Sequence, residues 1–151
     1  MATLEELSDR YEIDNLITAY CHAIDHRDWD ALDDIFTEDA IIDYTAAGGA
    51  KGDLAAAKRY LVRALEQFVG MQHFAGNTKL VINGDTAEGR TMLFNPMVVE
   101  KDGEQAVFFF GASYIDKFRR TENGWRIAHR SEDVNYIHNL PSWFRPVDPD
   151  E

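Results

Sequence analysis

Two side chains in this sequence are suited to acid–base chemistry, the aspartate at position 25 and the histidine at position 73. His73 lies in the stretch FVGMQHFAGNTKL, between an apolar approach and a segment with strand character. A neutral imidazole can take a proton near physiological pH. A carboxylate bonded to its other ring nitrogen would fix the tautomer and stabilise the imidazolium. The pattern alone favours a quiet core histidine at position 73 and a solvent-exposed helix-end acid at position 25, so the surrounding elements matter.

The N-terminal half of the chain has the spacing of helices. Apolar residues recur at near-helical intervals over 4–26, behind a capping-box pattern of Thr3 and Glu6, and this predicts a long amphipathic helix that ends near Asp25. A second, short helix is expected over 29–36, a strand over 40–44 and a loop at AAGGA. A third helix is expected over 53–68.

The C-terminal half has the period of strands. Four β-rich segments are expected, at 73–82, 87–100, 106–120 and 125–136, separated by the turn sequences NGD, KDGE and TENG. Three prolines predict an irregular tail over 137–151. Helices followed by a meander of strands indicate a single α+β domain over 1–151, in which a curved antiparallel sheet wraps around three helices. A small ligand would bind between the two layers.

Composition excludes several classes of partner. The net charge of −12 disfavours nucleic acid and anionic membranes, and no apolar run is long enough to span a membrane. A lone cysteine and the lack of a signal-peptide pattern favour the cytoplasm. His22 and His26 are spaced to share a metal, but nothing completes the motif, so neither a metal nor a cofactor is expected.

The segments AIDHRDWDAL, IIDY, FVGMQHFAGNTK and GWRIAHRSEDVNY resemble the SnoaL-like, nuclear-transport-factor-2-like (cystatin-like) superfamily. Within it they are similar to the scytalone dehydratase and gamma-hexachlorocyclohexane dehydrochlorinase families, over about residues 7–136. In both families a helix-end aspartate pairs with a histidine, and those positions match Asp25 and His73. Tyr44 matches a dehydratase tyrosine that polarises the substrate carbonyl. Arg130 matches a dehydrochlorinase arginine that assists the leaving anion.

The resemblance also implies which residues form the substrate pocket, namely Tyr20, Met97, Phe110, Ala112 and Tyr114. Where the dehydratase has a histidine, a serine and an asparagine, this chain has Met97, Ala112 and Tyr114. Tyr20 replaces a polar residue of the dehydrochlorinase. A site without a partner for a substrate hydroxyl or carbonyl rejects that substrate, so the first three replacements argue against scytalone. The replacement at Tyr20 means that the resemblance does not assure haloalkane chemistry either.

Two classes of function follow. In the first the protein is a lyase of the dehydratase or dehydrohalogenase type, or an isomerase, acting on a hydrophobic cyclic compound through Asp25 and His73. In the second it is a non-catalytic binding module or accessory subunit on the same fold, because a fold alone does not define chemistry. The resemblance further implies a homo-oligomer, a trimer or a dimer.

Overall fold

The computed structural model of the protein describes residues 1–150. Helix α1 spans Leu4–His26, and the predicted capping box is present. The Glu6 backbone N–H donates to Thr3 Oγ1 at 3.1 Å, and the Thr3 N–H donates to Glu6 Oε2 at 2.7 Å. The helix ends at Arg27, which has a left-handed backbone with φ 56°. The predicted bounds of the first helix are confirmed.

The second expected helix does not form, so residues 1–150 contain two α-helices and not three. Only a short 3-10 segment, η1 (Asp30–Asp34), occupies that part of the chain. Phe36, expected in this helix, instead begins strand β1 (Phe36–Asp43) and pairs with Ile127. Several closely spaced aspartates weaken a helix here, and pairing with a distant strand decides the conformation. The remaining α-helix is α2, Leu54–Glu66, with Asp53 as its N-cap.

Seven strands form one sheet in the order β2-β1-β7-β6-β5-β3, with β4 also paired to β5. The other strands are β2 (Lys51–Gly52), β3 (Phe68–Met71), β4 (Phe74–Asn83), β5 (Thr86–Lys101), β6 (Glu104–Thr121) and β7 (Gly124–His138). The predicted hairpin turn between β5 and β6 is present, and Asp102 and Gly103 both have positive φ, as a tight primed turn requires. The sheet is mixed and not purely antiparallel, because β1 runs parallel to β7. The sequence does not reveal this pairing, since the two strands are separated by most of the chain.

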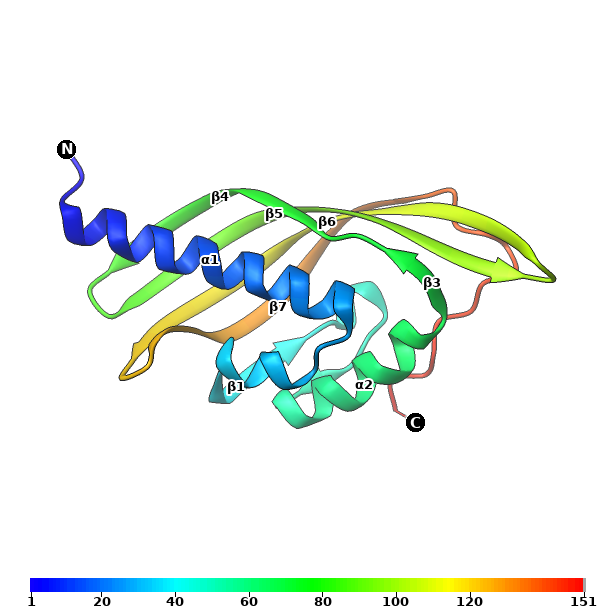
Figure 1. Ribbon diagram of the computed structural model, residues 1–151, viewed down its shortest axis with the longest axis horizontal. Coiled ribbons are helices and arrows are strands. Elements are labelled where there is room, and N and C mark those ends of the chain that lie inside the picture. The colour runs from blue at the N-terminus through cyan, green and yellow to red at the C-terminus, as the bar shows by residue number, and fades with distance from the viewer. Residues whose placement is uncertain (151) are drawn as a thin grey trace.

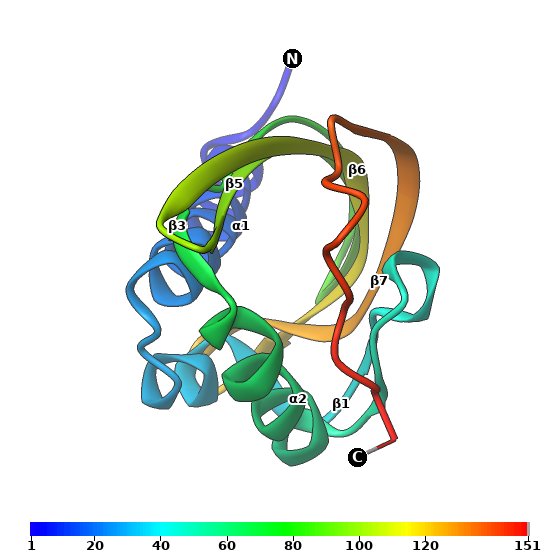
Figure 2. The same cartoon turned by 90° about the vertical axis from the view of Figure 1, so that its right-hand side faces the viewer.

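The long strands curve around the helices (Figures 1 and 2). One face of α1 contributes buried residues to the core that the sheet encloses, among them Ile13, Ile17 and Ile24. Asp9 ties the N-terminal part of α1 to the far end of the sheet. It accepts hydrogen bonds from Arg120 at 2.8 Å and from the Trp125 indole at 3.0 Å. The helix is therefore held along its length against the concave face.

Strands β3 and β4 are separated by a break of two residues, Gln72 and His73. On the neighbouring strand β5, Met97 pairs with β3 and Phe94 pairs with β4. Pro96 lies opposite the break, where its carbonyl accepts the Gln72 N–H at 3.1 Å. Proline has no N–H to offer a facing strand. The break in pairing therefore falls where the ladder already lacks a donor.

Residues 139–150 form turns and irregular backbone and cross the end of the molecule beside α2, whereas the first two residues of the tail predicted over 137–151 belong to β7 (Figure 2). Phe144 packs against Phe68 and Phe108, with ring centroids 5.8 and 5.7 Å apart. Trp143 lies under the Lys101 ammonium at 5.6 Å. Within residues 1–150, no helix has the length and apolar character needed to cross a membrane.

Candidate active site

The expected hydrogen bond between His73 and Asp25 is present. His73 Nδ1 lies 2.6 Å from Asp25 Oδ1, and the His73 backbone N–H donates to Asp25 Oδ2 at 2.9 Å. One carboxylate therefore holds both the ring and the main chain of His73. Burial raises the pKa of Asp25, but the hydrogen bonds from the His73 side chain and backbone outweigh burial and leave this pKa below its ordinary value. An ionised Asp25 accepts a proton-bearing Nδ1, so the lone pair of neutral His73 is on Nε2.

The end of α1 fixes the position of Asp25. Arg27, the residue that terminates the helix, donates from its guanidinium to the carbonyl oxygens of Leu65 at 3.0 Å and Phe68 at 2.7 Å. These carbonyls lie at the C-terminus of α2 and the start of β3, where free carbonyls need donors. The contact joins the ends of both helices, so Asp25 is held at a fixed distance from the strand break that carries His73.

Asn95 on β5 is the second partner of His73. Its side-chain Nδ2 lies 3.1 Å from His73 Nε2, and with Asp25 ionised the amide N–H donates to the Nε2 lone pair. Asn95 is 5% exposed, and its Oδ1 has no hydrogen-bond partner among the described residues. A substrate proton transferred to Nε2 would need Asn95 to release this nitrogen. Its free carbonyl oxygen could then accept the new Nε2–H after an amide rotation.

A pair of tyrosines lies on another wall of the same space. The hydroxyl oxygens of Tyr20 and Tyr44 are 2.7 Å apart. Burial raises the pKa of Tyr20 to about 12 and that of Tyr44 well above its ordinary value, so both phenols are protonated. Two O–H groups share one hydrogen bond, which leaves one O–H to donate to a ligand. Gly49 allows the approach of the preceding loop, because a Cβ there would lie 2.7 Å from Tyr44 Cβ.

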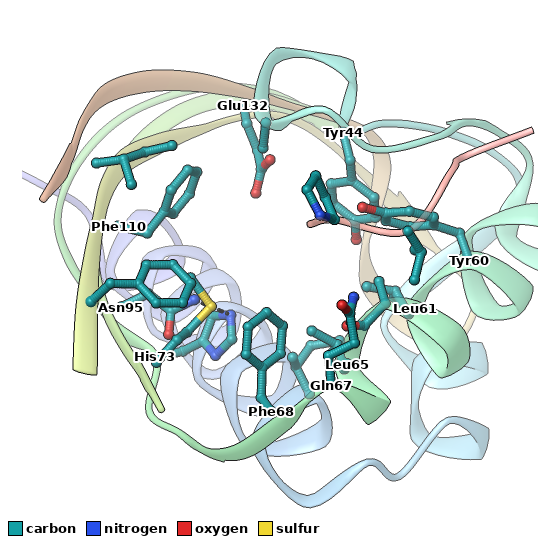
Figure 3. A pocket seen from close by; sticks show the side chains of 18 of the residues that line it. Tyr44, Tyr60, Leu61, Leu65, Gln67, Phe68, His73, Asn95, Phe110 and Glu132 are labelled. Carbon is teal, nitrogen blue, oxygen red and sulfur yellow. Dashed lines mark hydrogen bonds between the residues drawn. The ribbon is translucent and has the colours of Figure 1, made fainter. Parts of the chain in front are cut away.

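These groups surround a cavity of about 210 Å³ between α1, α2 and the sheet (Figure 3). His73 and Asn95 line one wall, whereas Tyr44 and Glu132 line others. A cavity of roughly 150 Å³ takes a benzene ring, so this one suits a substituted single ring. Most of the lining is apolar, contributed by Ile24, Leu61, Leu65, Phe68, Met97, Phe108, Phe110, Ile137, Leu140, Phe144, Pro146 and Val147.

Arg130 does not lie where the family resemblance suggested. Its side chain is completely buried between the rings of Tyr20 and Tyr114, 4.1 and 3.9 Å from their centroids, and it is not among the residues that line the cavity. Nε and Nη2 donate to the two carboxylate oxygens of Asp116 at 2.8 and 2.7 Å. Burial lowers the pKa of Arg130, but Asp116 outweighs it and holds this pKa well above its ordinary value. Asp116 pairs with Arg130 across β6 and β7 and draws the guanidinium away from the ligand space.

Most of the other expected site residues line the cavity, but one does not. Tyr20, Tyr44, Met97, Phe110 and Tyr114 line the cavity, whereas Ala112, which was expected there, is buried but does not. Ala112 follows the register shift of β6 against β7 between Gly111 and Ala112, and it borders a second hollow beside Phe74 and Tyr136. His22 and His26 stack on each other at 5.9 Å in the C-terminal part of α1, and His26 Nδ1 lies 2.8 Å from the His22 carbonyl oxygen.

Four polar residues that line the cavity were not predicted, namely Tyr60, Gln67, Asn95 and Glu132. Asn95 is two residues from Met97 on β5, and Glu132 is two residues from Arg130 on β7, so strand alternation places each on the inward face. This alternation is the feature of the sequence from which the inward position of Asn95 and Glu132 could have been predicted. Burial raises the pKa of the Glu132 carboxyl to about 7, despite the opposing influence of Arg130. The cavity is thus bordered by a histidine whose Nε2 is bonded to Asn95 and by a carboxyl group whose pKa burial raises to about 7.

A curved sheet around two helices, enclosing an apolar cavity that His73 borders, defines an α+β cone with an internal pocket. A family model described as a SnoaL-like domain matches residues 5–131. The chain therefore belongs to the SnoaL-like family, and its architecture is the NTF2-like, cystatin-like fold.

Among proteins of known sequence, an uncharacterized protein of Mycobacterium tuberculosis (strain ATCC 25618 / H37Rv) is 46% identical over 132 residues, which cover 87% of this chain and 89% of the relative. Among solved structures, a candidate aromatic ring hydroxylase from Novosphingobium aromaticivorans is 29% identical, with a TM-score of 0.79, and covers 89% of this chain and 94% of its own.

Structures of two lyase-named proteins are also similar. A scytalone dehydratase candidate from Novosphingobium aromaticivorans has a TM-score of 0.79 at 19% identity and covers 95% of this chain and 93% of its own. The hexachlorocyclohexane dehydrochlorinase LinA-type3 from Novosphingobium barchaimii has a TM-score of 0.76 at 19% identity, and the match covers 97% of this chain and 100% of the dehydrochlorinase chain. At this identity the likeness establishes a shared fold.

Proposed function

We propose that the protein is a small-molecule lyase or isomerase in which His73 removes an acidic C–H proton from a hydrophobic cyclic substrate. The observation that carries the proposal is the double hydrogen bond from Asp25 to His73 at the wall of an apolar cavity. Asp25 orients the ring and stabilises the imidazolium, as in other histidine bases held by a carboxylate. The names of the dehydratase and dehydrochlorinase relatives on this fold agree with elimination chemistry.

The tyrosine pair supplies the second half of the site. Removal of a proton beside a carbonyl puts negative charge on the carbonyl oxygen, and a positioned O–H donor in a dry cavity stabilises that charge. The Tyr20–Tyr44 pair has one O–H to spare. A cyclic ketone would bind with its carbonyl toward these phenols and its acidic carbon toward His73. Arg130 acts indirectly, by fixing the rings of Tyr20 and Tyr114.

Proton exchange tests the base without knowledge of the natural substrate. Cyclohexanone would be incubated with the protein in deuterated water, and deuterium uptake at its α-carbon followed by NMR. We expect the wild type to accelerate the exchange and His73→Gln to lose that acceleration. His22→Gln, at an exposed position of α1, is the matched control and should exchange like the wild type. Equal exchange in wild type and His73→Gln would reject the base and leave a non-catalytic binding module as the better account.

We also propose a homo-oligomer, formed through the outer face of the sheet. Large apolar side chains are exposed along a groove over β4, β5, β6 and β7, including Phe74 at 63%, Met92 at 58% and Tyr136 at 50% exposure. Exposed apolar clusters of this kind commonly mark protein interfaces. Light scattering should give a dimer or trimer, and Met92→Lys should shift it toward the monomer. A monomeric wild type at micromolar concentration would refute the proposal.

A further inference from the structure

Glu132 is the only carboxyl group among the described residues that line the cavity. It lies on β7, paired in register with Tyr114 of β6, and its carboxyl points into the space that His73 and Asn95 border (Figure 3). Strand β6 separates it from Asn95, which pairs with Phe110. Among residues 1–150, no hydrogen bond or ion pair engages the Glu132 side chain. A carboxyl group without partners, facing an apolar ligand space, is unexpected unless a ligand or reaction uses it.

The surroundings of Glu132 favour its protonated form. The titratable groups around it are Arg130 on the same strand, Asp116 and Tyr114 on β6, Asp43 on β1, Tyr44 after β1, Tyr20 on α1, Tyr60 on α2 and His73 across the cavity. The single cation in this set, Arg130, is already paired with Asp116. No lysine or arginine lines the cavity within the described part of the chain.

The two kinds of elimination place opposite demands on such a group. Hydroxide is a poor leaving group and departs as water when an acid gives it a proton. Chloride departs as an anion without a proton, and a carboxylate in the same small cavity would repel it. A cavity that contains a protonatable carboxyl and no accessible cation therefore suits loss of water better than loss of halide.

We propose that Glu132 is a catalytic general acid that protonates a hydroxyl group as it departs from the substrate. The proposal rests on the proposed role of His73 as base. His73 Nε2 takes the α-carbon proton, the C–H electron pair forms the new C=C bond, and the C–O bond breaks. The oxygen keeps that bonding pair and takes the Glu132 proton to leave as water. The imidazolium proton then returns to Glu132 through solvent, so the net products are the unsaturated ketone and water.

A matched pair of probes separates the two roles. 3-Hydroxycyclohexanone and 3-chlorocyclohexanone share the acidic carbon and the product, cyclohexenone, but differ in the leaving group. We expect Glu132→Gln to lower kcat/KM for the hydroxy ketone by about 100-fold or more and to change that for the chloro ketone by less than about threefold. Glu132→Asp should restore part of the hydroxy ketone activity. Glu88→Gln, an exposed substitution on β5, is the control and should match the wild type.

The pH profile gives a further readout. For the hydroxy ketone, wild-type kcat/KM should fall as the pH rises through about 7, where Glu132 loses its proton. The chloro ketone should show no such fall. Equal losses on both probes in folded Glu132→Gln, or no turnover of the hydroxy ketone by a wild type that exchanges cyclohexanone protons, would overturn the role of Glu132 while leaving His73 as the base. Loss of cyclohexanone exchange itself would instead reject the proposed function.

Discussion

Replacing Glu132 with glutamine should change how stability depends on pH, and this can be measured without any substrate. In the folded protein the Glu132 pKa is raised from its ordinary value of 4.5 to about 7, mainly by burial. Between these two values the folded state binds more protons than the unfolded state. The contribution of Glu132 to stability is therefore fully present below about pH 4.5 and is lost as the pH rises to about 7.

The size of this loss follows from the shift. At about 1.36 kcal/mol per pKa unit, the rise corresponds to about 3 kcal/mol as an upper limit, because water that enters the cavity screens the carboxylate. Glutamine has the same shape and no charge at any pH. The free energy of unfolding of Glu132→Gln, minus that of the wild type, should therefore be about 1–3 kcal/mol larger at about pH 8.5 than at about pH 5.

Urea denaturation of both proteins at the two pH values measures this difference directly. Subtracting the wild type from the variant cancels the other titrating groups, including Asp25. Glu88→Gln should track the wild type at both pH values. If the free energies of unfolding of Glu132→Gln and the wild type differ by the same amount at both pH values, the Glu132 carboxyl ionises as it does in water. That result would refute the reasoning about its environment.

Further substitutions test other parts of the structure. Arg130→Ala should destabilise the protein by about 3–5 kcal/mol in urea denaturation, because it leaves Asp116 buried without a partner. The double variant Arg130→Met/Asp116→Leu should recover most of this loss. A much smaller loss of stability in Arg130→Ala would contradict the importance of the ion pair. Asp25→Asn should slow cyclohexanone deuterium exchange by about 100-fold or more, and unchanged exchange would remove Asp25 from the mechanism. Phe144→Ala should weaken cyclohexenone binding by about tenfold in calorimetry, through the loss of an apolar wall; unchanged affinity would mean that the ligand does not reach the C-terminal segment.

Much of the fold could be predicted from local signals. The first helix was found from its apolar spacing and capping box, and the long strands from their alternation and turns. The short segment at Asp30–Asp34 was predicted as an α-helix, but a strand partner beyond residue 120 decides where β1 begins. Partners so distant in sequence leave no local pattern.

The candidate site could be predicted in outline. The pairing of Asp25 with His73 came from a family resemblance, whereas composition left it undecided. Arg130 was misplaced because its partner, Asp116, is an ordinary acid in the sequence until the register of β6 and β7 brings the two together. Alternation along β7 indicates the inward face of Glu132, but the burial of its carboxyl depends on neighbours such as Tyr20 and Tyr44, which come from distant parts of the chain.

The break between β3 and β4 opposite Pro96 gives His73 an unusual main-chain environment. A residue within a continuous strand has its amide proton protected by the sheet, and that proton exchanges with solvent only when the sheet opens. The His73 amide is instead bonded to the Asp25 side chain at 2.9 Å. The hydrogen-exchange rate and the chemical shift of this amide therefore depend on the protonation and the position of the Asp25 carboxylate. This single backbone amide is a spectroscopic reporter of the aspartate–histidine pair, readable in an NMR spectrum before any substrate is known.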